Sequence, residues 1–209
     1  MKISASFLSS NQISKDLEKL NVTDVDYIHV DVMDGKFVNN KSLAIKELKN
    51  IYKYTSKRLD VHLMVIDPIK AIKEFAKLNT EYITFHVELE KDILSLISLV
   101  HKYGIKCGLA ISPNTDIEMI FPYIEQLDLV VLMSVVPGES GQEFILETTV
   151  KLAKLKEKIE ENNLDIKVMI DGGINLETKD YVKEADILVS GSCILKSDNY
   201  QEVITDLRK

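Results

Sequence analysis

The sequence predicts a (β/α)₈ barrel, in which eight parallel strands close into a ring surrounded by helices. Strand-like and helix-like segments alternate along all 209 residues, and about eight such pairs fill the chain. The polar side chains of the strand-like segments gather towards their carboxyl ends, where barrels of this class carry their chemistry. A doubly wound open sheet is the alternative, but no Gly-x-Gly-x-x-Gly follows the first strand-like segment.

The predicted strands are short apolar runs, several of which alternate between apolar and polar residues. They are Ile3–Leu8, Tyr27–Asp31, Leu59–Met64, Tyr82–His86, Lys106–Ile111, Leu129–Ser134, Lys167–Asp171 and Ile187–Ser190. Their compact spacing leaves no room for a second domain, so we expect one catalytic domain over residues 1–209.

The predicted helices lie between these strands and after the last one. They are Ile13–Leu20, Leu43–Tyr54, Pro68–Lys77, Asp92–Tyr103, Asp116–Tyr123, Glu147–Glu161, Glu177–Val182 and Tyr200–Leu207. Three helix ends have recognisable signals. Asp67 precedes a proline in the first turn of one helix, Gly104 supplies a left-handed stop for another, and Asn175 can cap a third.

Composition bounds the class of protein. The chain is 45% hydrophobic and 28% charged, with a net charge of −7, so nothing suggests a surface for nucleic acid or anionic membranes. Cys107 and Cys193 form no paired motif, which fits a reducing compartment. The apolar run at the N-terminus is too short for a signal peptide, and no run is long enough to span a membrane, so we expect a cytoplasmic protein.

The second predicted strand carries the strongest chemical signal. Because side chains alternate along a strand, His29, Asp31 and Met33 share one face, while the opposite face is apolar. Burying an unpaired imidazole and carboxylate together is costly, so these groups need partners. A His-x-Asp pair on a rigid strand can hold a divalent cation.

Two other strands supply suitable partners. His62 lies in the third predicted strand, and Asp171 ends the seventh. If the strands are parallel, His29, Asp31, His62 and Asp171 converge near the carboxyl ends. Two imidazoles and two carboxylates suit zinc, iron(II), manganese or cobalt better than calcium or magnesium.

Glycine-bearing loops after the last two strands indicate a phosphate site. They read Asp171-Gly172-Gly173 and Ser190-Gly191-Ser192, and the second leads towards a short helix. Barrels often bind phosphate at this position through backbone N–H groups, and glycine allows a close approach. The loop Val136–Gln142 could cover the same pocket.

These motifs follow one another along nearly the whole chain in an order that resembles the ribulose-phosphate 3-epimerase family. Each motif is common alone, but the ordered set is highly specific. The motifs are Ser4-Ala5-Ser6-Phe7-Leu8-Ser9, His29-Val30-Asp31-Val32-Met33-Asp34-Gly35-Lys36-Phe37-Val38, Leu59-Asp60-Val61-His62-Leu63-Met64-Val65, Thr84-Phe85-His86, Met133-Ser134-Val135, Pro137-Gly138, Gly141-Gln142, Asp171-Gly172-Gly173 and Ser190-Gly191-Ser192.

The resemblance implies a barrel enzyme of the pentose phosphate pathway that interconverts D-ribulose 5-phosphate and D-xylulose 5-phosphate. It implies one divalent metal ion held by His29, Asp31, His62 and Asp171, with Asp31 and Asp171 as the acid/base pair. Because relatives commonly assemble, it also implies a homo-oligomer. The implied substrate contacts are Ser6, Met33, His62, Met64, Met133, Gly141, Asp171, Gly173, Gly191 and Ser192.

That reaction explains why two carboxylates are needed. Inverting a carbon beside a ketone removes a proton from one face and returns one to the other, and a divalent cation can stabilise the enediolate between the two steps. One base cannot easily serve both faces of a fixed substrate. Asp31 and Asp171 can flank it, one as base and the other as acid. Ser6 and His86 are expected to hold oxygens or orient ligands.

Several positions depart from the family pattern. Lys36 stands where the family usually has His, Asn39 where it has Pro, and Met169 where many relatives have Glu. The loop Val136–Gln142 is altered and adds Glu139 near the expected phosphosugar. Two alternatives therefore stay open: an epimerase of a related ketose phosphate such as allulose 6-phosphate, and a non-catalytic phosphosugar-binding barrel.

Overall fold

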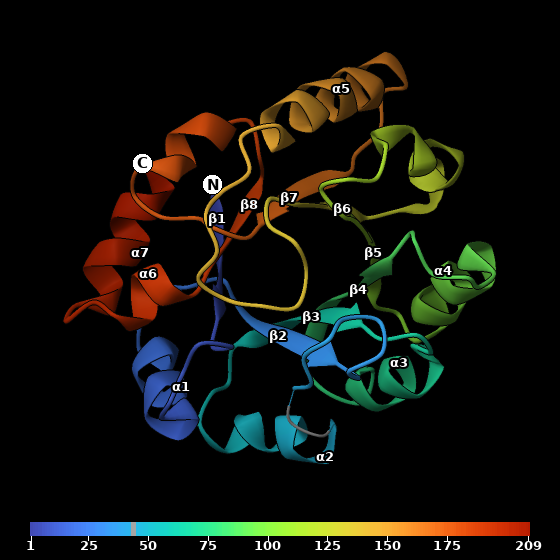
Figure 1. Ribbon diagram of the computed structural model, residues 1–209. Helices are drawn as coiled ribbons and strands as arrows, with labels where there is room; N and C mark the ends of the chain where they lie inside the picture. Colours follow the sequence, from blue (N-terminus) through green and yellow to red (C-terminus); the bar gives the residue numbers. More distant parts are fainter. Residues whose placement is uncertain (43–44) are drawn as a thin grey trace.

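The expected barrel is confirmed. In the computed structural model, which describes the backbone of residues 1–42 and 45–209, the strands form one closed ring in the order β1 to β8, and every neighbouring pair is parallel. Figure 1 shows the strands in the centre with helices around them. Among the described residues, no helix combines the length and apolar character needed to span a bilayer.

The strand boundaries agree closely with those expected from alternation. The observed strands are β1 (Lys2–Ser6), β2 (Tyr27–Met33), β3 (Arg58–Met64), β4 (Thr80–His86), β5 (Lys106–Ile111), β6 (Leu129–Met133), β7 (Lys167–Asp171) and β8 (Ile187–Ser190). Strand β2 continues past its expected end at Asp31 to Met33, so His29, Asp31 and Met33 all lie within one strand.

The helices are more varied than expected. They are α1 (Ile13–Asn21), α2 (Ile45–Leu48), η1 (Lys49–Lys53), α3 (Ile69–Phe75), α4 (Ile93–Lys102), η2 (Ile117–Met119), η3 (Phe121–Gln126), α5 (Thr148–Glu161), η4 (Thr178–Val182), α6 (Ser192–Leu195) and α7 (Tyr200–Arg208), where η marks a 3₁₀ helix. The helix predicted over Leu43–Tyr54 becomes α2 followed by η1, and its first two residues lie outside the described residues.

The helix predicted over Asp116–Tyr123 is instead two 3₁₀ turns, η2 and η3. Pro122 explains the difference, because it has no backbone N–H to continue an α-helical ladder through this segment. The predicted stop at Gly104 is confirmed, because α4 ends before it and Gly104 has a φ of 71°. The other two predicted caps lie just outside the cap position: Asp67 accepts from the N–H of Ile69 at 3.3 Å and Asn175 from that of Glu177 at 2.8 Å. The N-cap residues themselves are Pro68 and Glu177, and neither makes a side-chain cap hydrogen bond.

The interior of the barrel is divided by polarity. Side chains on the outer face of the strands pack against the helices in one continuous apolar core. Inside the ring, β6, β7 and β8 contribute apolar side chains such as Val131, Met169 and Ile187. The side chains of Ser4, His29 and Asp60 are also buried inside, on β1, β2 and β3. The polar chemistry is therefore carried mainly by the N-terminal half of the barrel.

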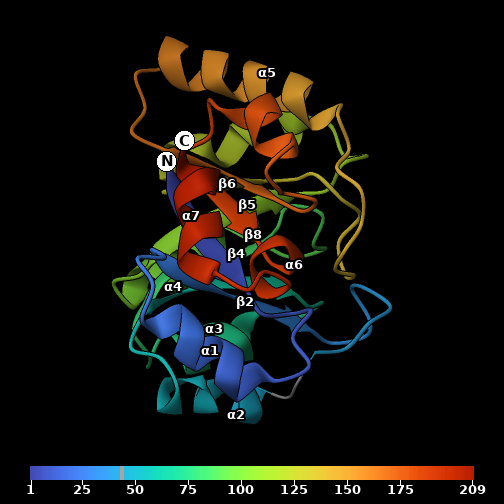
Figure 2. The ribbon, with the colours of Figure 1, turned by 90° about the vertical axis from the view of Figure 1, so that its left-hand side faces the viewer.

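Two loops meet over the carboxyl end of the barrel, on the right in Figure 2. One follows β2, and the other joins β6 to α5. Asn40 Nδ2 donates to the carbonyl oxygen of Gly138 at 3.0 Å. Gly138 has a φ of 113°, and a Cβ at this position would lie 2.9 Å from the Cβ of Val38. Glycine is needed there because the two loops approach so closely.

Candidate active site

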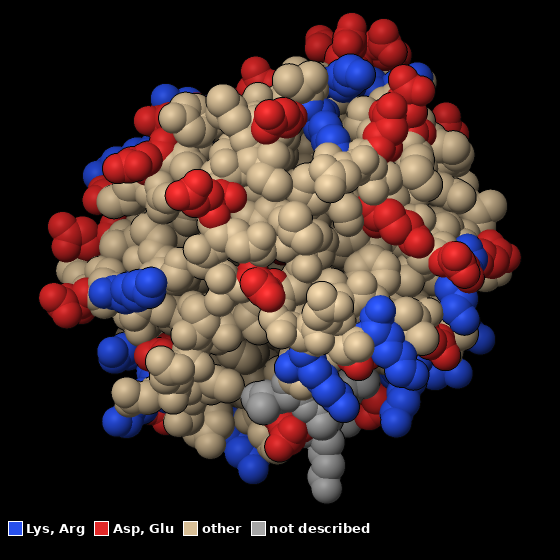
Figure 3. All heavy atoms as spheres, viewed as in Figure 1, with Lys and Arg blue, Asp and Glu red and all other residues tan. Residues whose placement is uncertain are grey.

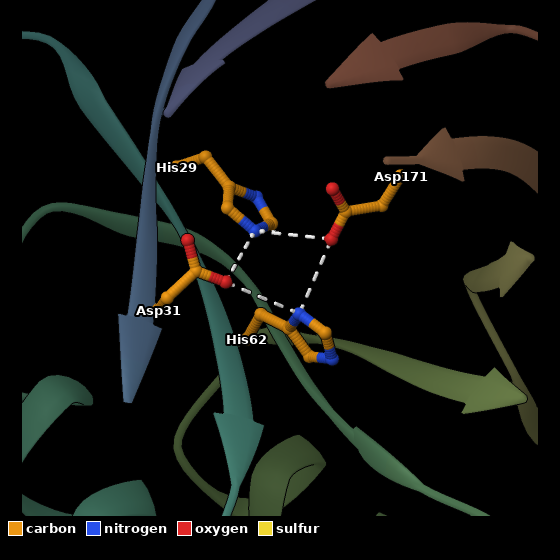
Figure 4. A group of neighbouring side chains, drawn as sticks. All are labelled: His29, Asp31, His62 and Asp171. Atoms are coloured by element: carbon orange, nitrogen blue, oxygen red, sulfur yellow. Dashed lines mark ion pairs between the residues drawn. The ribbon is translucent and has the colours of Figure 1, made fainter. Parts of the chain in front are cut away.

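Four side chains from three strands converge at the carboxyl end of the barrel. One ligand atom each from His29, Asp31, His62 and Asp171 lies within 4.8 Å of the other three. His29 Nε2 is 3.3 Å from Asp31 Oδ1 and 3.4 Å from Asp171 Oδ2. His62 Nδ1 is 3.5 Å from Asp31 Oδ1 and 3.3 Å from Asp171 Oδ2. Figure 4 shows the four groups turned towards one shared point.

The strand register explains this convergence. Parallel pairing sets His29 beside Asp60 and Asp31 beside His62 on the neighbouring strand β3. Asp171 ends β7 on the other side of the ring and reaches the same point across the barrel. Because side chains on one face of a strand all point into the barrel, the pairing brings together residues that are far apart in sequence.

His29 is fixed from behind by Asp60. His29 Nδ1 lies 2.7 Å from Asp60 Oδ2, which also accepts from Ser4 Oγ at 2.9 Å. All three residues are buried. Sequence reasoning assigned no role to Asp60, although it lies on the same strand face as His62 and two residues before it. A carboxylate on a ligand-bearing face was the signal that could have identified it.

His62 is supported by two side chains in series, whereas His29 contacts its supporting carboxylate directly. Its Nε2 lies 2.9 Å from Nε2 of His86, whose Nδ1 lies 3.1 Å from Glu88 Oε2. His86 was expected to orient a ligand, and it does contact His62. Glu88 was not anticipated from the sequence, because its function depends on a contact made only after β4 takes its place beside β3.

The residues present fit a divalent metal ion. His29 Nε2 and His62 Nδ1 are buried ring nitrogens without a hydrogen-bond partner among the described residues, and both face the two carboxylates. Leaving such atoms unpaired is costly, which a bound cation would relieve. Two imidazole nitrogens and two carboxylate oxygens form a donor set suited to a first-row transition metal or zinc.

Mutual electrostatics control the protonation of this cluster. Burial lowers the pKa of His62, but the nearby carboxylates of Asp171 and Asp31 outweigh it and raise the pKa to about 9. The pKa of His29 is raised well above its ordinary value, because Asp31, Asp60 and Asp171 outweigh the effect of burial. Burial raises the pKa values of Asp31 and Asp171, but the neighbouring imidazoles lower both below the usual range.

A cavity of about 640 Å³ opens beside the four-residue cluster. Ser6, Met64 and Met133 line it, as do Asp31 and Asp171, whereas Met33 is buried and is not among the lining residues. Ser6 Oγ donates to Asp31 Oδ2 at 3.1 Å. The residues expected to contact a phosphate line the same cavity: Gly141, Gly173, Gly191 and Ser192.

The glycine loops bring their backbone close to neighbouring segments. Gly173 has a φ of 65°, and a Cβ there would lie 2.7 Å from the backbone nitrogen of Phe144. A Cβ on Gly191 would lie 3.1 Å from the carbonyl oxygen of Ser6. Backbone N–H groups of Gly173 and Gly191 donate to no backbone carbonyl among the described residues. Both residues line the cavity, so two backbone N–H groups without a backbone acceptor belong to its wall, and such groups are able to bind anions.

The cavity wall is acidic. The carboxylates that line it include Asp31, Glu139, Glu143, Asp171 and Glu177, while no described Lys or Arg does so. Figure 3 shows acidic side chains over this face and most of the basic ones towards its edge. Such a wall favours a cation and leaves an anionic group dependent on backbone N–H groups.

Of the departures seen in the sequence, only the loop after β6 reaches the cavity. Its lining residues run from Pro137 to Phe144 and include Glu139. Lys36 is exposed and is not among the lining residues. Met169 is fully buried in the apolar layer inside the barrel, two residues before Asp171 on β7.

Known proteins resemble this chain over nearly its full length. The family model described as the ribulose-phosphate 3 epimerase family matches residues 2–195. A ribulose-phosphate 3-epimerase from Methanocaldococcus jannaschii is 38% identical, covering 100% of this chain and 90% of the relative. One from Schizosaccharomyces pombe is 33% identical, covering 99% and 92%.

Solved structures agree on the fold. A crystal structure of 3-hexulose-6-phosphate synthase covers 100% of this chain and 98% of its own, with a TM-score of 0.71 and 13% identity. Because the two sequences are only 13% identical, this structural similarity supports the barrel fold alone. The family match over residues 2–195 and the full-length relatives go further: this chain belongs to the ribulose-phosphate 3-epimerase family of enzymes.

Proposed function

We propose that this enzyme inverts C3 of D-ribulose 5-phosphate to give D-xylulose 5-phosphate, with Asp31 and Asp171 as the two proton-transfer groups. The convergence of these carboxylates carries the proposal. They come from β2 and β7, their closest candidate ligand atoms lie within 4.8 Å, and both line one cavity. The family relationship supplies the substrate class.

The reaction requires a base on one face of the sugar carbon and an acid on the other. One aspartate takes the proton from C3, and the other returns a proton from the opposite face. Their lowered pKa values keep both carboxylates ionised in the metal-free protein, so the aspartate that acts as the acid must take a proton from solvent before the substrate closes off the pocket. Ser6 donates to Asp31 Oδ2 and fixes the direction in which that carboxylate points.

His29, Asp31, His62 and Asp171 would hold one divalent cation. Bound there, the cation would act as a Lewis acid for the negative charge that develops on the substrate oxygens when the proton leaves. Met64 and Met133 form soft, non-titrating walls beside the same point and help to exclude water.

The phosphate of the substrate would bind in the same cavity, on the side away from the proposed cation site. Gly173, Gly191 and Ser192 offer backbone N–H groups there, and no described Lys or Arg lines the cavity. Recognition through oriented N–H groups fits this arrangement, because a phosphate can be held without a cationic side chain.

Turnover on ribulose 5-phosphate tests the proposal. The assay couples xylulose 5-phosphate formation to a detectable product and compares metal-loaded protein with a chelator-stripped sample. We expect turnover that depends on added zinc, iron(II), manganese or cobalt. Loaded protein that performs no better than the stripped control would rule the proposal out.

The altered loop after β6 favours a second substrate candidate, the 6-phosphate of a related ketose such as allulose. Glu139 and its neighbours line the cavity, so the loop lies where a longer sugar would differ from a pentose. Comparing kcat/KM for the two sugars separates the candidates, and we expect the pentose phosphate to be preferred. A protein that binds either sugar without exchanging its C3 hydrogen for solvent deuterium would instead be a binding module.

We also propose a homo-oligomer, on the family resemblance. Light scattering coupled to size-exclusion chromatography gives the mass of the assembly directly. A monomeric mass at micromolar concentration would contradict this part of the proposal.

A further inference from the structure

His62 is the first of three side chains in a hydrogen-bonded chain that ends at the edge of the barrel. His62 comes from β3, His86 ends β4, and Glu88 follows two residues later. The two Nε2 atoms of the imidazoles are 2.9 Å apart, and His86 Nδ1 is 3.1 Å from Glu88 Oε2. We propose that His86 and Glu88 are positioning residues that fix the tautomer and orientation of His62. The inference rests on the metal site of the proposed function.

Only one arrangement of protons satisfies every contact in this chain when a cation is bound. His62 faces the cation site with Nδ1, so this nitrogen must keep its lone pair and Nε2 must carry the hydrogen. That hydrogen is donated to His86 Nε2, which must therefore be unprotonated. The hydrogen of neutral His86 then lies on Nδ1 and is donated to Glu88.

Glu88 is held as an acceptor at the far end. Its Oε1 accepts from the backbone N–H of Ser112 at 2.7 Å. Burial raises the pKa of Glu88, but hydrogen bonds from His86, Thr115 and Ser112 lower it to about 2. An ionised carboxylate cannot donate, so it dictates the direction of the hydrogen bond from His86.

A clamp from α5 fixes the loop that contacts Glu88. Lys151 Nζ donates to the carbonyl oxygen of Ser112 at 2.9 Å and also to those of Pro113 and Thr115. The loop after β5 is therefore tied to a helix at three carbonyls. The Ser112 N–H cannot easily turn away from Glu88, and the support of His62 extends from α5 to the cation site.

The negative charge already present at the site explains why the imidazole of His86 lies between His62 and the carboxylate of Glu88. His29 is supported directly by Asp60, whose side chain is 1% exposed, and this adds a third carboxylate beside the partly buried Asp31 and Asp171. A fourth carboxylate, buried against His62, would face strong repulsion and desolvation. Neutral His86 spans the distance, so the fourth charge lies on Glu88, whose side chain is 22% exposed.

Other roles for His86 fit the geometry less well. Both of its ring nitrogens are engaged, one with His62 and one with Glu88, so neither is available to a cation. His86 is fully buried and is not among the residues that line the cavity, so it does not reach the substrate. Its contacts suit a residue that acts through His62.

The tautomers can be observed directly in the unsubstituted protein. Zinc, which is diamagnetic, is bound to ¹⁵N-labelled protein, and long-range ¹H–¹⁵N correlation spectra of the histidine rings are recorded. We expect His62 protonated on Nε2 and neutral His86 protonated on Nδ1. A hydrogen on Nε2 of His86, or a doubly protonated His86, would overturn the inference.

Substitution of Glu88 supplies a second test, with Glu90 as a matched control. Glu90 is exposed on the same loop. Zinc affinity is measured by competition with a chromophoric chelator. We expect Glu88→Ala to weaken zinc binding roughly 10- to 100-fold, Glu88→Gln to weaken it less, and Glu90→Ala to leave it unchanged. Equal zinc affinity in Glu88→Ala and Glu90→Ala, both folded by circular dichroism, would contradict the role.

These measurements separate this inference from the proposed reaction. Neither uses a sugar. The expected tautomers without turnover on ribulose 5-phosphate would remove the proposed function and keep the positioning role. Turnover on ribulose 5-phosphate together with the wrong tautomer on His86 would keep the proposed function and remove the positioning role.

Discussion

His29 and Asp60 form the shortest polar contact at the candidate metal site, 2.7 Å between Nδ1 and Oδ2. They are direct neighbours in the register between β2 and β3, and both are buried. Because Asp60 accepts from Nδ1, a neutral His29 ring with a cation bound would carry its lone pair on Nε2, which is the nitrogen that faces Asp31 and Asp171.

Replacing Asp60 should therefore weaken metal binding without touching a ligand. We expect Asp60→Asn to lower zinc affinity by roughly 10- to 100-fold, since the charged acceptor behind His29 is lost. Ser4→Ala is the matched control, because it removes one donor to Asp60 and leaves the contact with His29. Competition with a chelator measures the zinc affinity of both variants. If Asp60→Asn bound zinc as tightly as the unsubstituted protein, the carboxylate of Asp60 would have no part in metal binding.

The two proposed proton-transfer groups should each be essential. We expect Asp31→Asn and Asp171→Asn to lower kcat by roughly 10²- to 10⁴-fold, because an amide can neither take nor return the C3 proton. Thermal unfolding of each variant checks that the fold persists. Metal content is measured in parallel, because both residues are also proposed ligands. A variant that retains metal and full activity would lose its assigned role.

Metal binding should depend on pH. The pKa of His62 in the metal-free protein is raised to about 9, so its ring carries a proton at neutral pH that a cation must displace. Affinity should therefore rise as pH increases from 7 towards about 9, and binding at pH 7 should release protons. Calorimetry in buffers with different ionisation enthalpies measures that release. An affinity independent of pH over this interval would contradict it.

The raised pKa of His62 also predicts how the stability of the metal-free protein changes as the pH increases. A raised pKa in the folded state means that protonated His62 contributes stability below its unfolded pKa. That contribution is lost as pH rises through about 9. The melting temperature of stripped protein should fall over this interval, whereas saturating zinc should remove the dependence. Identical profiles with and without zinc would argue against a cation at this cluster.

Gly173 should matter for phosphate binding as well as for the fold. Gly173 and Gly104 both have positive φ values, 65° and 71°, but only a Cβ on Gly173 would meet another segment, the backbone of Phe144. We expect Gly104→Ala to lower Tm by roughly 2–4 °C from backbone strain, and Gly173→Ala to lower it further because its Cβ would also press on the backbone of Phe144. Only Gly173→Ala should also raise KM. Equal KM values in the two variants would remove Gly173 from the phosphate site.

Much of the fold could be predicted from short stretches of sequence. Strands β5, β7 and β8 have the expected boundaries, because apolar runs bounded by glycine and polar residues leave few alternatives. The segment before β6 was harder to predict. Its residues suit an α-helix, but Pro122 in η3 has no backbone N–H to continue an α-helical ladder, and the segment forms two 3₁₀ helices instead.

The sequence by itself determined which side chains point into the barrel, because alternation along a strand is a local property. His29, Asp31, His62 and Asp171 could be selected as candidate ligands in this way, and the structure brings the four together. The supporting contacts were decided by tertiary structure. Asp60 reaches His29, and Glu88 reaches His62 through His86, only after strands distant in sequence pair in one register. A carboxylate has no sequence mark that distinguishes a buried acceptor behind an imidazole from an ordinary surface charge; that difference arises from the neighbours that folding supplies.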